Sequence, residues 1–92
     1  MTTGYQRDYL KVAHKHSSLH KKEVLQSDLC GCFYCLKTFK SDEIAEWIDT
    51  DNSKDETALC PLCGIDSVIG DKSGLPVTDA IFLNDMNSLY FT

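Results

Sequence analysis

The apolar positions of the last third of the chain recur with the period of an α-helix. They fall on one face over two turns: Phe82, Leu83, Met86, Leu89 and Tyr90. Thr78 can cap such a helix, and Asp79 places an acid in its first turn. The pattern predicts a C-terminal helix over about 78–90.

The N-terminal part has a weaker pattern. Residues 1–17 begin polar and then contain four apolar residues, Tyr9, Leu10, Val12 and Ala13, which suit a short helix or an extended arm. Ser17 or Ser18 can cap a following helix that runs to about Gln26.

The middle of the chain carries the pattern of a β-hairpin. Ser41 followed by two acids predicts a short helical turn at 42–45, and a strand is expected near 46–50. The polar loop 49–56 is rich in Asp, Asn and Ser, which favour turns, and residues 57–59 form the expected return strand. The apolar side chains of this region are expected to be buried together: Phe39, Ile44, Trp47 and Ile48.

Two C-x2-C turns, each called a knuckle, flank this hairpin. The first is Cys32-Phe-Tyr-Cys35 and the second is Cys60-Pro-Leu-Cys63. Each spacing allows two thiolates on one tight turn to face the same ion, and two knuckles supply the four ligands of a tetrahedral site. A closed shell leaves no position for a substrate, so a structural zinc ion is expected, bound by these four cysteines. Iron would also fit this site, because soft thiolate ligands in a tetrahedral arrangement suit either metal.

Other polar and thiol groups have less specific patterns. Cys30 is expected to be a small residue beside the site; a spare ligand or a redox thiol is the alternative. His14, His16 and His20 are expected to lie in a solvated polar segment, although a second metal site or nuclease chemistry would also use histidines. The loop acids Asp66 and Asp71, with Ser73, are expected to accept hydrogen bonds from turn amides. No nucleophile–base pair can be named, so no catalytic residue and no enzymatic activity are expected.

Length and charge limit the remaining possibilities. A chain of 92 residues predicts one domain with a marginal hydrophobic core, which a zinc site can supplement. Residues 1–22 carry a net charge of +4 and residues 23–92 a net charge of −9, which together give the −5 of the whole chain. We therefore divide the chain into a basic N-terminal arm, 1–18, and a zinc-binding domain, 19–92. The arm is expected to lie against an acidic surface of its own chain or of a partner subunit.

The same features bear on partners and location. The acidic body argues against wrapping of duplex DNA, because phosphate neutralisation dominates that affinity. A protein partner is expected, and the apolar C-terminal helix would also suit a homodimer. No apolar run approaches the roughly 20 residues of a membrane span. Free thiols and metal knuckles fit a reducing interior, so a cytoplasmic location is expected.

Three runs of the sequence resemble a group of small bacterial cytoplasmic proteins without an assigned function. They are Cys30-Gly-Cys-Phe-Tyr-Cys35, Glu43-Ile44 with Trp47, and Ala58-Leu-Cys-Pro-Leu-Cys-Gly-Ile-Asp-Ser-Val-Ile-Gly70. The similarity covers about residues 19–90 and implies only a double-knuckle metal site at Cys32, Cys35, Cys60 and Cys63. The run Cys60-Pro-Leu-Cys63-Gly64 is also similar to the second knuckle of rubredoxin, which would imply an iron electron carrier. Leu36 departs from that family, which has glycine at this place.

Together these patterns predict a small α+β metal-bound domain. Its double knuckle would be zinc-ribbon-like, rubredoxin-like or treble-clef-like, with a β-hairpin and flanking helices. The expected role is a structural-zinc module for protein–protein interaction. An iron electron carrier and nucleic-acid binding through the N-terminal arm are the alternatives.

Overall fold

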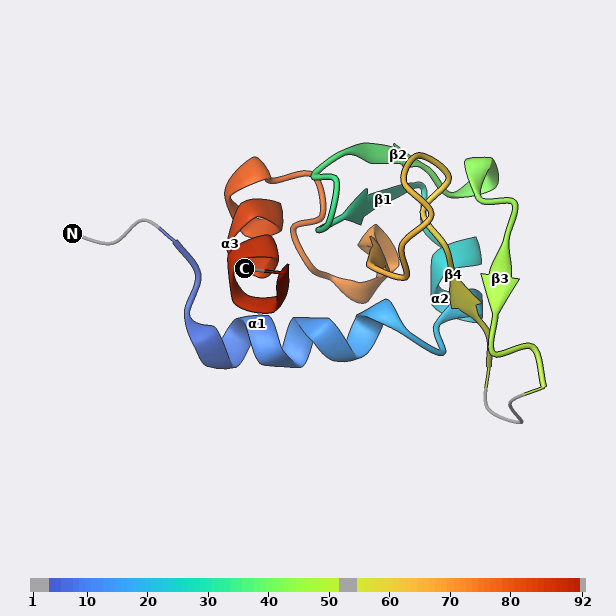
Figure 1. Cartoon of the computed structure of the whole chain (residues 1–92), viewed down its shortest axis with the longest axis horizontal. Helices are drawn as coiled ribbons and strands as arrows, with labels where there is room; N and C mark the ends of the chain where they lie inside the picture. The colour runs from blue at the N-terminus through green and yellow to red at the C-terminus, as the bar shows by residue number, and fades with distance from the viewer. Residues whose placement is uncertain (1–3, 52–54, 92) are drawn as a thin grey trace.

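A three-stranded antiparallel sheet forms the centre of the molecule (Figure 1). The computed structural model describes residues 4–51 and 55–91. In the sheet, β1 (Leu29–Cys32) lies between β2 (Thr38–Lys40) and β5 (Val68–Gly70). Cys30 is opposite Phe39 on one side and Gly70 on the other. The sequence pattern did not predict these strands, because each has only three or four residues.

The predicted hairpin is confirmed, with shorter strands than expected. It pairs β3 (Trp47–Ile48) with β4 (Thr57–Ala58), and Trp47 is opposite Ala58. Residues 52–54 of the predicted loop lie outside the described residues. The expectation that Ile48 is buried is wrong: its side chain is exposed, whereas Phe39 is buried and Trp47 half-buried.

The helical turn before the hairpin, η2, covers Ser41–Glu43 and is a 3₁₀ turn. Ser41 does not cap it, because its hydroxyl donates to the carbonyl oxygen of Ser27 at 2.6 Å. The Glu43 carboxylate instead accepts a hydrogen bond from the Lys40 amide at 2.8 Å. A side chain of the turn itself therefore satisfies the backbone amide at the N-terminal end of η2.

The N-terminal segment that the sequence left open is helical. Here α1 (Arg7–His14) continues into the 3₁₀ turn η1 (Lys15–Ser17). Residues 1–3 of the predicted arm lie outside the described residues. The next helix, α2 (Lys21–Leu25), begins after His20 and is shorter than predicted, so neither Ser17 nor Ser18 caps it.

The predicted C-terminal helix is confirmed as α3 (Ala80–Phe91), which follows the 3₁₀ turn η3 (Asp71–Ser73). Asp79, rather than Thr78, caps it, since the Asp79 carboxylate accepts a hydrogen bond from the Ile81 amide at 2.9 Å. Tyr5 ties the start of the described chain to this helix: its hydroxyl donates to Asp79, and its amide donates to Asp85 at 2.8 Å.

The sheet separates two clusters of buried side chains, because successive residues of a strand point to opposite faces. On one face, Ile69 of β5 packs with α1 and α3. On the other face, Cys30 and Cys32 of β1 and Val68 of β5 pack with Val24 of α2 and the hairpin. The first cluster forms the helical layer, in which α1 runs beneath α3 (Figure 1). The second cluster contains the cysteines.

Gly31, in the middle of β1, joins the two layers closely. A Cβ atom at this position would collide with the carbonyl oxygen of Val77 and touch the Leu83 side chain. The strand that carries the first knuckle can therefore approach the segment before α3 only because residue 31 has no side chain.

Among the described residues, no helix has the length and apolar character that crossing a bilayer requires.

Candidate metal centre

The four knuckle cysteines come together in space. Their sulfur atoms all lie within 4.8 Å of one another. Two contacts join the knuckles: Cys32 Sγ to Cys63 Sγ at 3.6 Å and Cys35 Sγ to Cys60 Sγ at 3.8 Å. Zn–S bonds of about 2.3 Å in a tetrahedron place the sulfurs about 3.8 Å apart. The cluster therefore has the size of a four-sulfur metal site, and Cys60 faces Cys35 as the hairpin pattern predicts.

Each knuckle lies between two strands. Cys32 ends β1 and its knuckle leads to β2, whereas the second knuckle follows β4 and leads to β5. The two turns are closed in the same way: the Leu36 amide donates to the Cys32 carbonyl and the Gly64 amide to the Cys60 carbonyl, both at 2.9 Å. The residues after Cys63 thus form a turn and then a strand, not the first turn of a helix.

The residue after each knuckle is left-handed, with φ of 64° at Leu36 and 81° at Gly64. Glycine adopts this conformation freely, but a residue with a side chain pays about 1–2 kcal/mol for it. The sequence indicated a departure from the rubredoxin pattern at Leu36. The backbone nevertheless makes the same turn there, and backbone amides approach the sulfurs in both knuckles, Tyr34 N to Cys32 Sγ and Leu62 N to Cys60 Sγ, each at 3.4 Å.

The electrostatics of the cluster favour a bound cation. Burial acts to raise the pKa of the Cys32 thiol, but hydrogen bonds from the Ser67 hydroxyl at 3.0 Å and from backbone amides outweigh it and lower the pKa. At Cys63, burial and the neighbouring sulfurs raise the pKa to about 12, and the pKa of Cys35 is also raised, mainly by burial. A thiolate at one cysteine therefore disfavours deprotonation of its neighbours. A bound cation is needed to keep all four cysteines as thiolates.

The cluster is buried on one side. Cys32 and Cys60 are 0% and 3% exposed, whereas Cys35 and Cys63 are half-buried. Cys30 lies in the same apolar cluster but is not among the four sulfurs that come together. Burial raises its pKa to about 12. Cys30 is therefore a neutral buried thiol beside the site, as the sequence indicated.

The three histidines of the N-terminal segment do not come together. His14 stacks on Tyr90 with ring centroids 4.0 Å apart, and His16 Nδ1 lies 3.0 Å from a Glu23 carboxylate oxygen. His20 is buried, so the expectation of a wholly solvated segment is wrong for it. Among the described residues, the four cysteines are the only group with the geometry of a metal site.

His20 instead joins α2 to the hairpin. Its Nδ1–H donates to the His16 carbonyl, and its Nε2 accepts a hydrogen bond from the Ala58 amide at 3.1 Å. The backbone amides of His20 and Lys21 both donate to the Glu56 carbonyl, at 2.8 and 3.0 Å. The Lys21 ammonium also pairs with the Glu56 carboxylate at 3.1 Å. Part of the basic segment therefore lies against the acidic body of its own chain.

The stability of the protein is expected to fall as the pH falls below about 6.5, the ordinary pKa of histidine. Burial lowers the pKa of folded His20, although the hydrogen bond to the His16 carbonyl and the charges of Glu23 and Asp55 oppose this effect. Between the folded and unfolded pKa values the unfolded chain binds more protons, so the free energy of unfolding decreases by up to about 1.4 kcal/mol per pH unit. An imidazolium also cannot accept the Ala58 hydrogen bond.

Urea unfolding at about pH 7 and about pH 5.5 measures this effect, in the wild type and in His20→Asn. The metal content is followed in parallel, because protonation of the cysteines also releases metal. The wild type should lose more stability between the two pH values than the variant. Equal losses would contradict the role of His20.

The loop after the second knuckle is fixed by its own side chains. The Asp71 carboxylate accepts hydrogen bonds from the amides of Asp28 and Leu29, at 3.1 and 3.2 Å. Ser73 donates to the Gly70 carbonyl at 2.6 Å. The predicted structural role is confirmed for these two residues. Asp66 is different, because its carboxylate makes no hydrogen bond or ion pair with the rest of the described chain.

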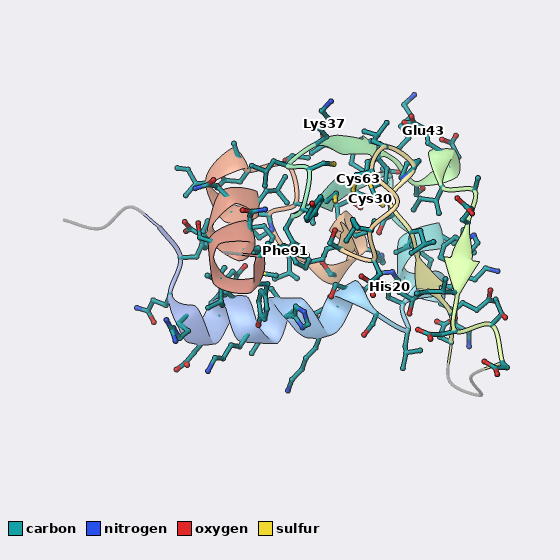
Figure 2. All side chains as sticks on the ribbon, in the orientation of Figure 1. His20, Cys30, Lys37, Glu43, Cys63 and Phe91 are labelled. Atoms are coloured by element: carbon teal, nitrogen blue, oxygen red, sulfur yellow. The ribbon has the colours of Figure 1, made fainter. Side chains whose placement is uncertain are left out.

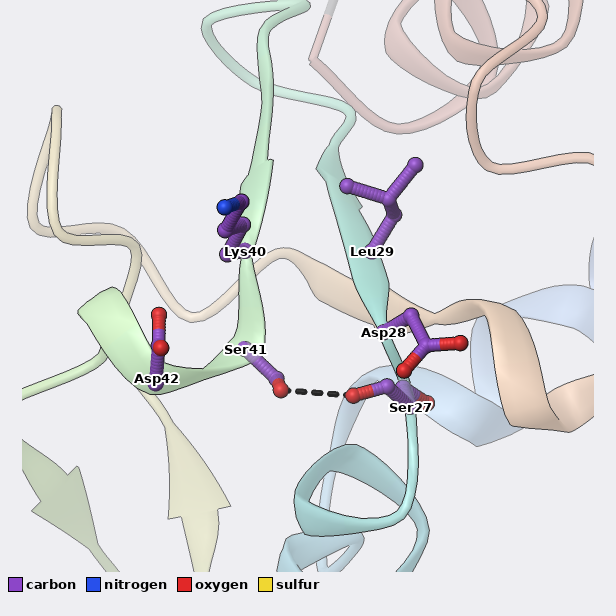
Figure 3. A pocket seen from close by; sticks show the side chains of 6 residues that line it. All are labelled: Ser27, Asp28, Leu29, Lys40, Ser41 and Asp42. Atoms are coloured by element: carbon purple, nitrogen blue, oxygen red, sulfur yellow. Dashed lines mark hydrogen bonds between the residues drawn. The ribbon is translucent and has the colours of Figure 1, made fainter.

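A polar cavity of about 310 Å³ lies where β1 begins and β2 ends (Figure 3). The exposed side chains of Asp28, Lys40 and Asp42 line it, and the Ser41–Ser27 hydrogen bond closes one side. These groups include no base placed against a nucleophile. The cavity therefore adds no catalytic candidate to the cysteine cluster.

Comparison with protein-family models, with curated proteins and with solved structures found no match. The resemblances to small bacterial proteins and to rubredoxin thus remain predictions from the sequence. What the structure supports is their common element, a pair of knuckles whose four sulfurs could hold one metal ion.

Proposed function

We propose that this protein is a structural-zinc module that binds a protein partner. The observation that carries the proposal is the distance between the sulfurs of the two knuckles, 3.6 and 3.8 Å, which matches the edge of a tetrahedral zinc–thiolate site. Cys32, Cys35, Cys60 and Cys63 would be the ligands. Bound there, zinc would link β1, the hairpin and β5 without offering a coordination position to a substrate.

The position of the strands supports a zinc-ribbon-like arrangement. Each knuckle lies between two strands, and β5 follows the second one, whereas a treble clef would continue from it into a helix. The closed shell supports a binding role rather than catalysis. Reduced thiols suit a reducing compartment, so we assign the protein to the cytoplasm.

A rubredoxin-like iron centre is the second candidate. It is favoured by the equivalence of the two knuckles, because Leu36 and Gly64 close the same turn and an amide approaches a sulfur in each. Zinc is preferred as the usual occupant of a four-cysteine structural site.

Elemental analysis of protein purified from its native cell under reducing conditions tests the proposal. We expect about one zinc ion per chain and a colourless solution. Red protein with about one iron ion per chain would support the electron carrier instead. A folded, fully reduced protein without metal would contradict both.

A further inference from the structure

A cavity of about 250 Å³ lies between the end of α1 and the end of α3, on the opposite face of the sheet from Cys30 and Val68. Four aromatic rings line it: His14 of α1, Phe33 of the first knuckle, and Tyr90 and Phe91 of α3. Two serines and Asp66 complete the lining. Figure 2 shows Phe91 at the end of α3, above α1.

The rings surround the cavity at different inclinations. Phe33 lies 6.1 Å from Tyr90 and 5.6 Å from Phe91 between centroids, with interplanar angles of 54° and 40°. His14 stacks on Tyr90 and is tilted by 57° to Phe33. Phe33 is only 1% exposed, whereas Phe91 is 41% exposed and His14 is also exposed, so the cavity opens to solvent mainly at these two rings. The negative face of an aromatic ring attracts a cation.

The charge at the cavity has one sign. Its lining contains no lysine or arginine, and Asp66 contributes a carboxylate that has no partner among the described residues. The basic side chains nearest in sequence to His14 are Lys11 of α1 and Lys15 of η1; both are exposed and neither is part of the lining. The acidic body, residues 23–92 with net charge −9, adds an attraction for cations at longer range.

We propose that this cavity binds a lysine side chain of a partner protein. The ammonium group would lie against the aromatic faces and pair with Asp66, and the aliphatic part of the side chain would cover the rings. The Phe33 ring is tilted to both Tyr90 and Phe91, which gives a planar guanidinium no common plane on which to stack and favours a compact ammonium. This inference rests on the proposed function and names the chemistry of the partner.

The metal centre would hold one wall of this cavity in place. Phe33 lies between the ligands Cys32 and Cys35, and its amide donates to the Ser67 carbonyl beyond the second knuckle at 3.1 Å. The carbonyls of Phe33 and Tyr34 in turn accept hydrogen bonds from Asn87 of α3, at 3.0 and 3.2 Å. Binding of the lysine would therefore depend on the metal through the position of Phe33.

The experiment is a nuclear magnetic resonance titration of the full metal-loaded chain with three short peptides. They are acetylated, amidated tripeptides, glycine–X–glycine, in which X is lysine, norleucine or arginine. Norleucine keeps the aliphatic chain and lacks the charge. We expect saturable shifts at Phe33, Asp66 and Phe91, and binding of the lysine peptide about 5-fold tighter than that of the norleucine peptide.

Two variants test the roles of the charge and the ring. Asp66→Asn and Phe91→Leu should each weaken lysine binding about 3-fold or more, since one removes the carboxylate and the other an aromatic face. Both residues are exposed, so both variants should keep the fold. Asp42→Asn, which removes an exposed acid at the polar cavity, is the matched control and should bind like the wild type.

Equal binding of the lysine and norleucine peptides, tighter binding of the arginine peptide, or unchanged binding by Asp66→Asn would overturn the proposal. The zinc content of every sample is measured before titration. Zinc-loaded protein that does not distinguish the peptides contradicts the lysine site alone. Folded protein that contains no zinc contradicts the structural-zinc proposal, whatever it binds.

Discussion

The Cys32→Ser variant is expected to lose its zinc and to unfold, and a strong chelator should do the same to the wild type. Structural zinc contributes roughly 10–16 kcal/mol of apparent binding free energy in small zinc fingers. The whole free energy of unfolding of a domain is about 5–15 kcal/mol, so the fold should not survive without the ion. Circular dichroism and zinc content, measured on the same samples with and without chelator, check this result.

Cys30→Ala is the matched control, because Cys30 lies on the same face of β1, two residues away and equally buried. It should keep one zinc ion per chain and lose only about 1 kcal/mol of stability, the usual cost of a small change in a core. Zinc loss in Cys30→Ala would contradict the ligand set. Unchanged circular dichroism after complete removal of zinc would contradict a structural role of the ion.

Phe82→Ala should destabilise the metal-loaded protein by about 3–5 kcal/mol, because it empties the centre of the helical layer. Phe82 is 0% exposed and makes edge contacts with the Tyr5 and Tyr9 rings, at centroid distances of 5.4 and 6.3 Å. Loss of the Phe82 ring therefore weakens the packing of α3 against Tyr5 and against Tyr9 of α1. Urea unfolding in the presence of excess zinc measures the change.

The neighbouring residue provides the comparison. Ile81 belongs to the same turn of α3 but is 46% exposed, so Ile81→Ala should change the stability by less than about 1 kcal/mol. The two variants separate burial from helix propensity, since both introduce alanine at adjacent positions. A loss of less than about 1 kcal/mol in Phe82→Ala would show that the helical layer contributes little to the fold.

The features that the sequence predicted depend on short-range patterns. The knuckles follow from the spacing of Cys32 to Cys35 and of Cys60 to Cys63, and α3 follows from a helical period that is visible within one segment. The hairpin is similarly local, because a single polar loop joins its strands. These patterns were sufficient to predict an α+β domain with four cysteines in one place.

The features that the sequence did not predict depend on partners far along the chain. The central sheet needs Cys32 opposite Val68, and neither strand is long enough to show its own period. Buried His20 accepts a hydrogen bond from the Ala58 amide. No local sequence pattern links a histidine in a basic segment to this distant amide. The predicted caps, Ser41 and Thr78, lie one or two residues from the observed ones, Glu43 and Asp79. The Ser41 hydroxyl donates instead to the Ser27 carbonyl, a partner from another part of the chain.

The left-handed turn at Leu36 makes the two halves of the metal site equal in shape but unequal in energy. Gly64 takes this conformation at no cost, whereas Leu36 takes it against a preference of about 1–2 kcal/mol. In the metal-free chain, the second knuckle is therefore nearer to its final form. A metal ion bound by the four cysteines would therefore use more of its binding free energy in shaping the first knuckle than in shaping the second.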